Sequence, residues 1–403
     1  MSVLVSASGS MLMLRLAAGL HLFVLLFLFF GDLRTAQASF WRQMTHVPDD
    51  LPHLVFFKEN ELFLTSSSDL QLWGCGFSAR QFYLRGLDGA LQNSALRCYR
   101  RNFAMRVNLE YALVWLVVRT LGALPRSLSR AVGMFVAVGA YAVMGRLRKV
   151  GMRNLQIAFP KMPQKEKRRI IFKLFVGFGR HLAEFCMFPR YTRENAGAVA
   201  TYEGFENFDK ARAAGRGVLF LTGHFGGWEI GSFVHSIFGN PMKIVVRRLD
   251  NPKVDALVER YRTLHGNETF AKEDFARGLL GAMKAGETVG ILMDTNMTPP
   301  QGVFVDFFGT PACTAAGVAR VALRSGAAVV PAFTIWDNLL RKYRVRFDPA
   351  LTLVSTGNDE ADAVANTALF TRVIQNYATH YPEQWLWVHR RWKTRPQGES
   401  PLY

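Results

Sequence analysis

From about residue 151 onward, apolar positions alternate between the spacing of helices and the continuous runs of buried strands. Residues 164–188 carry apolar side chains at helical spacing, which predicts a helix with one buried face. Strands are predicted at 218–221, 243–247, 289–293, 302–308, 327–333, 343–347 and 384–388. Further helices are predicted at 228–238, 252–264, 275–284, 314–324 and 359–379.

This alternation predicts an α/β fold over residues 151–403, with a sheet covered by helices on both faces. The 403 residues are 50% hydrophobic and 20% charged, too apolar for a disordered chain and too charged for a polytopic membrane protein. Four cysteines share no CxxC spacing, which argues against a zinc ribbon or a disulfide scaffold. We therefore expect reduced thiols and no metal site.

Two apolar stretches precede this domain. Residues 11–30 are long enough to span a bilayer, and the Ala36-x-Ala38 pattern after them resembles a signal-peptidase site. The second stretch lies within 105–150 and ends in a group of basic residues, which favours the cytoplasmic face of a membrane. We predict that 105–150 is a membrane anchor, either one tilted span or a hairpin in one leaflet. The alternative is an amphipathic helix pair packed on the soluble domain.

The charge of the chain points to an anionic partner. Lysine and arginine number 49 against 31 aspartate and glutamate, a net charge of +18. Nucleic acid, a membrane surface, an acidic protein or a phosphorylated substrate would all fit this balance. No nucleic-acid-binding module is recognisable in the sequence, so we do not expect nucleic acid as a partner.

The segment GVLFLTGHFGGWE, residues 217–229, carries the most chemical information. A buried strand leads into a glycine turn, and His224 follows the carboxyl end of the strand, where open α/β sheets bind ligands. Glu229 lies in the first turn of the next helix, from which its carboxylate would reach one imidazole nitrogen and orient a general base. The alternative is a buried histidine beside a glutamate favoured by the helix dipole. The spacing does not match the HExxH zinc motif.

The His224-x4-Glu229 motif resembles that of the bacterial lipid A biosynthesis acyltransferases, the lauroyl and myristoyl transferases of the lysophospholipid-acyltransferase superfamily. Further blocks are similar to the family's and follow in its order across about 105–403. They are the arginine segment with Arg247, the strand-end aspartate Asp294, residues 302–314 and residues 382–396.

The resemblance implies a glycerolipid-acyltransferase-like sheet with an N-terminal membrane anchor. It also implies transfer of a fatty acyl chain from acyl carrier protein to a hydroxyl of a lipid A precursor, without a cofactor. His224, oriented by Glu229, would take the hydroxyl proton, and N–H groups of the glycine turn would stabilise the oxyanion. Arg247 would meet the oxyanion or a substrate phosphate, and Asp294 would support the site.

A basic cluster near the end of the chain suits a diphosphorylated sugar lipid, because guanidinium forks pair with phosphate oxygens. Its members are Arg390, Arg391, Lys393 and Arg395. The alternative is a solvated basic tail. The resemblance thus predicts an enzyme at the cytoplasmic side of the bacterial inner membrane, with acyl carrier protein and a phosphorylated lipid as partners. Two alternatives stay open: an acyltransferase for another membrane lipid or glycolipid, and a non-catalytic adaptor that binds anionic lipid.

Residues 1–104 depart from the resemblance, since the family's members begin close to their anchor. They carry 9 Lys/Arg and 7 Asp/Glu, a net +2, so residues 105–403 hold +16 of the +18. We expect a chain that begins at Met105 to keep full membrane association and acyl transfer, measured by flotation and initial rates. Abundant peptides from 40–104 in the native protein, together with loss of function on truncation, would contradict this.

Overall fold

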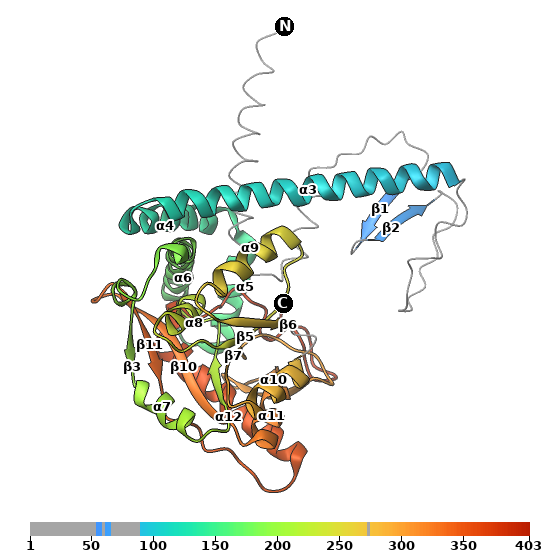
Figure 1. Cartoon of the computed structure of the whole chain (residues 1–403). Helices are drawn as coiled ribbons and strands as arrows, with labels where there is room; N and C mark the ends of the chain where they lie inside the picture. Colours follow the sequence, from blue (N-terminus) through green and yellow to red (C-terminus); the bar gives the residue numbers. More distant parts are fainter. Residues whose placement is uncertain (1–53, 59–60, 66–88, 272–274) are drawn as a thin grey trace.

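The computed structural model describes residues 54–58, 61–65, 89–271 and 275–403 (Figure 1). The apolar stretch at 11–30 and the signal-peptidase-like pattern after it lie outside these residues. Near the start of the described chain, β1 (Leu54–Lys58) and β2 (Glu61–Thr65) pair as an antiparallel hairpin.

Seven strands form one sheet in the order β3-β11-β10-β4-β7-β5-β6. All neighbours in it are parallel except β10 and β11, which form an antiparallel hairpin. The strands are β3 (Ala200–Glu203), β4 (Val218–Thr222), β5 (Lys243–Val246), β6 (Glu268–Ala271), β7 (Thr288–Leu292), β10 (Ala328–Asp337) and β11 (Lys342–Phe347). The predicted α/β fold with a mainly parallel sheet is confirmed.

Helices cover both faces of the sheet, which explains the continuous apolar runs of the strands. On β4, Leu219 and Leu221 pack into one hydrophobic cluster, while Val218 and Phe220 pack into the other. The first cluster includes residues of α10 (Phe275–Lys284), α11 (Gly317–Ser325) and α12 (Asp359–His380). The second includes residues of α7 (Phe205–Ala213), α8 (Trp228–Ile237) and α9 (Pro252–Arg262).

In the part of the chain that the structure describes, four α-helices precede the sheet, and α3 lies across the top of the molecule as drawn in Figure 1. They are α3 (Gly89–Ala123), α4 (Arg126–Val143), α5 (Gly145–Ala158) and α6 (Gln164–Cys186), followed by the short 3-10 helices η1 (Phe188–Arg190) and η2 (Ala196–Ala198). α4 crosses α6 at Gly133 and Gly179, where a Cβ on either glycine would lie 2.4 Å or 2.3 Å from the other's carbonyl oxygen. Only glycine permits so close an approach of two helix backbones.

The stretch predicted to be a membrane anchor is therefore packed, at α4, against the domain that follows it. Within the described chain, no single helix combines the length and apolar character that a bilayer span requires. The bent pair of α4 and α5, with 85° between the two helices, meets that requirement by length and composition.

One predicted element is wrong, and the start of another is displaced. At 384–388 the chain forms the 3-10 helix η4 (Pro382–Gln384) and an irregular segment with an isolated bridge from Trp385 to Phe225. Its apolar run reflects burial of Trp385 and Trp387 without strand pairing. The helix predicted from Thr314 begins at Gly317, because β9 (Thr310–Ala315) pairs with β8 (Gly302–Phe307) in a hairpin. The sequence patterns also missed β3, α7 and β6.

His235 of α8 is buried among aromatic rings and bonded to the Tyr202 hydroxyl, 2.6 Å from its Nδ1. Burial, and then the charge of Arg212, lower its pKa from 6.5 to about 3. Between these values the unfolded chain binds more protons, so the free energy of unfolding falls as pH falls, by up to ~1.4 kcal/mol per pH unit.

We therefore expect the thermal midpoint to drop between pH 6.5 and pH 5, and to drop less steeply in His235→Asn. The thermal midpoint of the variant is expected to be lower at every pH, since the Tyr202 hydroxyl loses its present partner. The comparison is therefore between the slopes of the thermal midpoint against pH and not between the midpoints themselves. Differential scanning calorimetry at several pH values measures both. Parallel slopes in the two proteins would contradict the prediction.

Candidate active site

Three of the predicted site residues lie at one edge of the sheet. β4, β7 and β5 are adjacent and parallel, so their carboxyl ends meet there. His224 follows the end of β4 by two residues, Asp294 follows the end of β7 by two, and Arg247 directly follows β5. This is the edge at which open α/β sheets bind ligands. Arg247 is exposed there.

Asp294 holds His224 by two hydrogen bonds. Oδ1 of the carboxylate lies 2.8 Å from Nδ1 of the imidazole, and Oδ2 accepts from the backbone N–H of His224 at 2.7 Å. The Trp385 indole also donates to Oδ2, at 2.9 Å. Burial alone would raise the pKa of Asp294, but the facing imidazole and these donors outweigh it and hold the pKa below its ordinary value. An ionised carboxylate at Nδ1 keeps the proton on that nitrogen and leaves Nε2 as the base.

The imidazole remains accessible, with 19% of the His224 side chain exposed. Its ring lies edge-on to Trp228, with 5.4 Å between ring centroids. Trp228 in turn packs on His181, at 4.2 Å, and Nδ1 of His181 donates to the Gly226 carbonyl oxygen at 3.0 Å. Burial lowers the pKa of His181 to about 4, so this ring is neutral at physiological pH. Sequence reasoning missed both residues: His181 lies in no motif, and Trp385 lies in the block 382–396, where only the basic residues were given a role.

Glu229 has a different partner from the one predicted. Its carboxylate forms a bidentate ion pair with Arg262 at the end of α9, at 2.9 Å and 2.5 Å. Burial alone would raise the pKa of Glu229, but Arg262 and then the nearby histidines outweigh it and lower the pKa. The structure thus joins His224 to Asp294 from the next strand, while Glu229 on α8 faces α9. His224 is one of the histidines that contribute to the lowered pKa of Glu229.

The glycine turn positions His224 but does not present two of its amides to a substrate. The N–H of Gly226 donates to the Gln384 carbonyl oxygen at 2.9 Å, and that of Gly227 to the Thr334 carbonyl oxygen at 3.0 Å. Gly226 has φ +51, and a Cβ there would lie 2.1 Å from the Thr334 oxygen. Glycine is therefore required for the chain to pass beside β10. The oxyanion donors predicted in this turn have to come from groups other than these two amides.

The four residues of the basic cluster near the end of the chain differ in burial and in their partners. Arg391 is 1% exposed, and its guanidinium donates to the Cys313 carbonyl oxygen at 2.8 Å and to the Thr314 hydroxyl. Arg395 donates to the Pro311 carbonyl oxygen and pairs with Glu399.

These two arginines therefore fasten the terminal segment to β9, which a phosphate-binding role does not require. Arg390 lies over the Tyr403 ring, 5.9 Å from its centroid, and Lys393 is exposed. Of the four side chains, Lys393 is thus the most open to a ligand.

Comparison with known proteins finds similar sequences over most of the chain. The sequence model of the family described as "Bacterial lipid A biosynthesis acyltransferase" matches residues 101–394. The "Lipid A biosynthesis lauroyltransferase" of Escherichia coli (strain K12) is 30% identical over 298 residues, covering 73% of this chain and 94% of that protein. The "Lipid A biosynthesis palmitoleoyltransferase" of the same strain is 28% identical, covering 72% and 92%. Its "Lipid A biosynthesis myristoyltransferase" is 24% identical, covering 64% and 80%.

Replacement of the carboxylate by an amide is expected to affect catalysis at Asp294 and stability at Glu229. His224→Ala and Asp294→Asn should each lower kcat by ~10²–10⁴-fold with the fold retained, because one removes the base and the other the charge that stabilises its protonated form. Glu229→Gln should instead lower the thermal midpoint, since breaking a buried ion pair costs ~3–5 kcal/mol.

Initial rates and thermal midpoints are measured on the same preparations. Glu206→Gln, an exposed carboxylate on α7, is the matched control and should change neither quantity. A folded Asp294→Asn protein with near-normal rates would remove Asp294 from the mechanism. A Glu229→Gln protein of unchanged stability that had lost its activity would show that Glu229 takes part in the mechanism.

Proposed function

Because the chain belongs to the bacterial lipid A biosynthesis acyltransferase family, we propose that it transfers a fatty acyl chain from acyl carrier protein to a hydroxyl of a lipid A precursor. The observation that carries the proposal is the pair formed by Asp294 and Nδ1 of His224, which leaves Nε2 as a partly exposed base. The relatives' names support the acceptor class.

In the proposed reaction, Nε2 of His224 takes the proton of the acceptor hydroxyl as its oxygen attacks the thioester carbonyl carbon. The tetrahedral intermediate then collapses, the carbon–sulfur bond breaks, and the imidazolium returns the proton to the thiolate that leaves. Asp294 stabilises the imidazolium between these steps, as the carboxylate of a catalytic triad does. Asp294 therefore takes the orienting role that the sequence pattern had suggested for Glu229.

Arg247 is the proposed cation for the oxyanion or for a substrate phosphate, since it is exposed where β5 ends, on the same sheet edge as His224. The amides of Gly226 and Gly227 already have carbonyl partners, so they do not serve this role. The ion pair of Glu229 and Arg262 fixes α8 to α9 behind the site. Its contribution in this scheme is to the position of α8 and the glycine turn.

We further propose that the catalytic domain works at the cytoplasmic face of the inner membrane, with residues 105–150 as its anchor. α3 and α4 carry several large apolar side chains exposed to solvent, as interfacial helices do. They include Trp115, Leu116, Leu128, Phe135 and Val138. The basic residues at the start of α5 would face anionic headgroups.

Purified protein incubated with a lipid A precursor is the direct test, with the acylated product identified by mass spectrometry. With acyl carrier protein as donor, we expect the apparent donor affinity to fall with salt, because the carrier is acidic and this domain basic. The Debye length shrinks from ~10 Å at 0.1 M to ~3 Å at 1 M salt.

Acyl-CoA is the control donor and should be used poorly at every salt concentration. Equal use of both donors, with no effect of salt, would contradict the assignment of the carrier protein. Acylation of a lysophospholipid or a mannoside in preference to the lipid A precursor would overturn the proposed acceptor.

A further inference from the structure

A cavity of about 350 Å³ lies between α6, the end of β10 and η4. Its walls are aromatic and cationic, and Gly226 of the catalytic turn forms part of them. The residues that matter to the argument are Phe172, Lys173, Arg180, Trp336, Tyr343 and Glu383. His224, Asp294 and Glu229 do not line this cavity, so it is separate from the proposed base although it adjoins the same turn.

Arg180 brings a positive charge to this cavity, and no carboxylate of the described residues forms an ion pair with it. Its guanidinium lies over the Trp336 ring, 4.0 Å from the centroid. In the part of the chain that the structure describes, no hydrogen bond or ion pair engages this guanidinium. Glu184, the nearest acid on the same helix, is already paired with Arg126 at 2.9 Å and lies 3.8 Å from Arg130.

The other charged residues near the cavity do not change this balance. Lys173 is exposed on the rim and, among the described residues, has no carboxylate within ion-pair distance. Glu383 also lines the cavity, but the ion pairs among the described residues do not include one between Glu383 and Arg180. Burial lowers the pKa of Arg180, and the like charges of Arg130 and Arg341 act in the same direction. The cavity is therefore cationic, with N–H donors on a planar guanidinium, a combination that suits phosphate oxygens.

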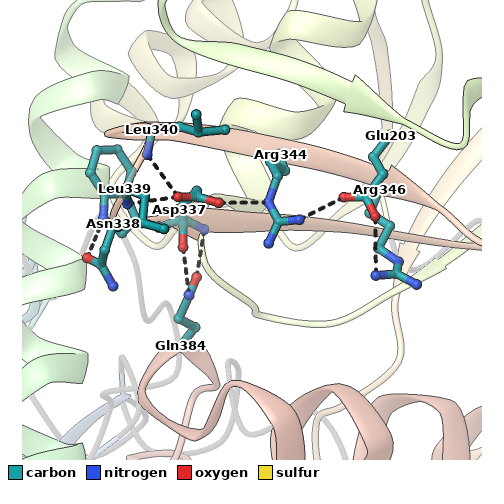
Figure 2. Close-up of polar contacts among 9 residues, drawn as sticks. Glu203, Asp337, Asn338, Leu339, Leu340, Arg344, Arg346 and Gln384 are labelled. Carbon is teal, nitrogen blue, oxygen red and sulfur yellow. Dashed lines mark hydrogen bonds and ion pairs between the residues drawn. The ribbon is translucent and has the colours of Figure 1, made fainter.

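The wall formed by the β10–β11 hairpin is held in place by a polar network (Figure 2). The Gln384 side chain bonds both the N–H and the carbonyl oxygen of Trp336, at 2.8 Å and 3.0 Å. Asp337 accepts from the N–H groups of Leu339 and Leu340 and pairs with Arg344 at 3.2 Å. The acid on this hairpin is thus engaged within it, and the Trp336 ring is positioned before any ligand arrives.

Beside Lys173, apolar side chains near the mouth of the cavity are exposed to solvent. Phe172 is 39% exposed, and Leu339 and Leu340, directly after the cavity residue Asn338, are 94% and 56% exposed. Leu339 and Leu340 lie at the tip of a fixed hairpin with their apolar surface in water. Contact with hydrocarbon would remove that surface from water, which is favourable in free energy. A phosphate site with an apolar rim suits an amphipathic lipid better than a free phosphate ion.

We propose that this cavity binds a phosphate group of the lipid acceptor, with Arg180 as its main contact and Lys173 as a second. The identity of the acceptor rests on the proposed function. A phosphate bound here would lie next to the catalytic turn, because Gly226 lines the cavity. His181, which follows Arg180 in the chain, donates a hydrogen bond to the Gly226 carbonyl oxygen. A lipid anchored at this point would present its sugar hydroxyl toward the sheet edge that carries His224.

The test is a binding measurement, which requires no turnover. Neutral phosphatidylcholine vesicles are doped with the diphosphorylated acceptor lipid or with the same lipid after phosphatase treatment, and binding of the full chain is titrated. We expect wild type to prefer the phosphorylated lipid by about tenfold or more, the range of charge-assisted hydrogen bonds. Arg180→Gln should lose most of that preference, while its binding to the dephosphorylated lipid stays within about twofold of wild type.

Lys173→Gln should reduce the preference by a smaller factor, and it keeps the test open if Arg180→Gln folds poorly, since Lys173 is exposed. Arg169→Gln and Lys165→Gln remove the same charges from exposed positions on the same helix and should behave as wild type. Thermal midpoints confirm that each protein is folded.

An unchanged preference in folded Arg180→Gln and Lys173→Gln would overturn the proposal. So would an equal loss of binding to vesicles that contain phosphatidylglycerol and no acceptor, which would mark a general anionic-lipid site. Inorganic phosphate at millimolar concentration is used as a competitor. If it bound as tightly as the acceptor lipid, the assignment of a lipid ligand would be overturned as well. Failure of acyl transfer alone would count against the proposed function and leave this binding result standing.

Discussion

One buried carboxylate holds the catalytic end of the sheet together. Asp294 accepts hydrogen bonds from the backbone and the ring of His224 and from the indole of Trp385. The donors come from the turn after β4 and from the C-terminal segment, and Asp294 itself follows β7, so the site is complete only when all three have packed. Removing a carboxylate from water is costly, and several donors offset that cost and keep the group ionised. The geometry of the base is therefore a property of the whole domain.

Sequence patterns predicted the parts of the site that depend on local chemistry. The run of apolar residues, the glycines and the helix start between 217 and 229 are all encoded within one short segment. That segment fixes the place of His224 but not its partner. Glu229 is five residues away along the chain, yet its side chain faces Arg262, while Asp294 arrives from the neighbouring strand. Trp385 was hidden in an apolar run that the same reasoning assigned to a strand.

The net charge of +18 gives little guide to where an anion would bind. Arg391 and Arg395 stood out in the sequence as a basic cluster, but they bind backbone carbonyls and fasten the terminal segment. Arg180 lies in an amphipathic helix among many basic residues and attracts no attention in the sequence. Its guanidinium lies over the Trp336 ring, a contact that only the packing of α6 against β10 can reveal.

The crossing of α4 and α6 at Gly133 and Gly179 makes these two helices move as one body. Backbone touches backbone there, so no flexible side chain can absorb a displacement of α4. Gly179 directly precedes Arg180 and His181, and His181 holds the carbonyl of the catalytic turn. In the proposed membrane placement, the exposed face of α4 would meet the bilayer, and lateral pressure there would reach the turn that carries His224 through α6. Turnover would then depend on the mechanical state of that membrane.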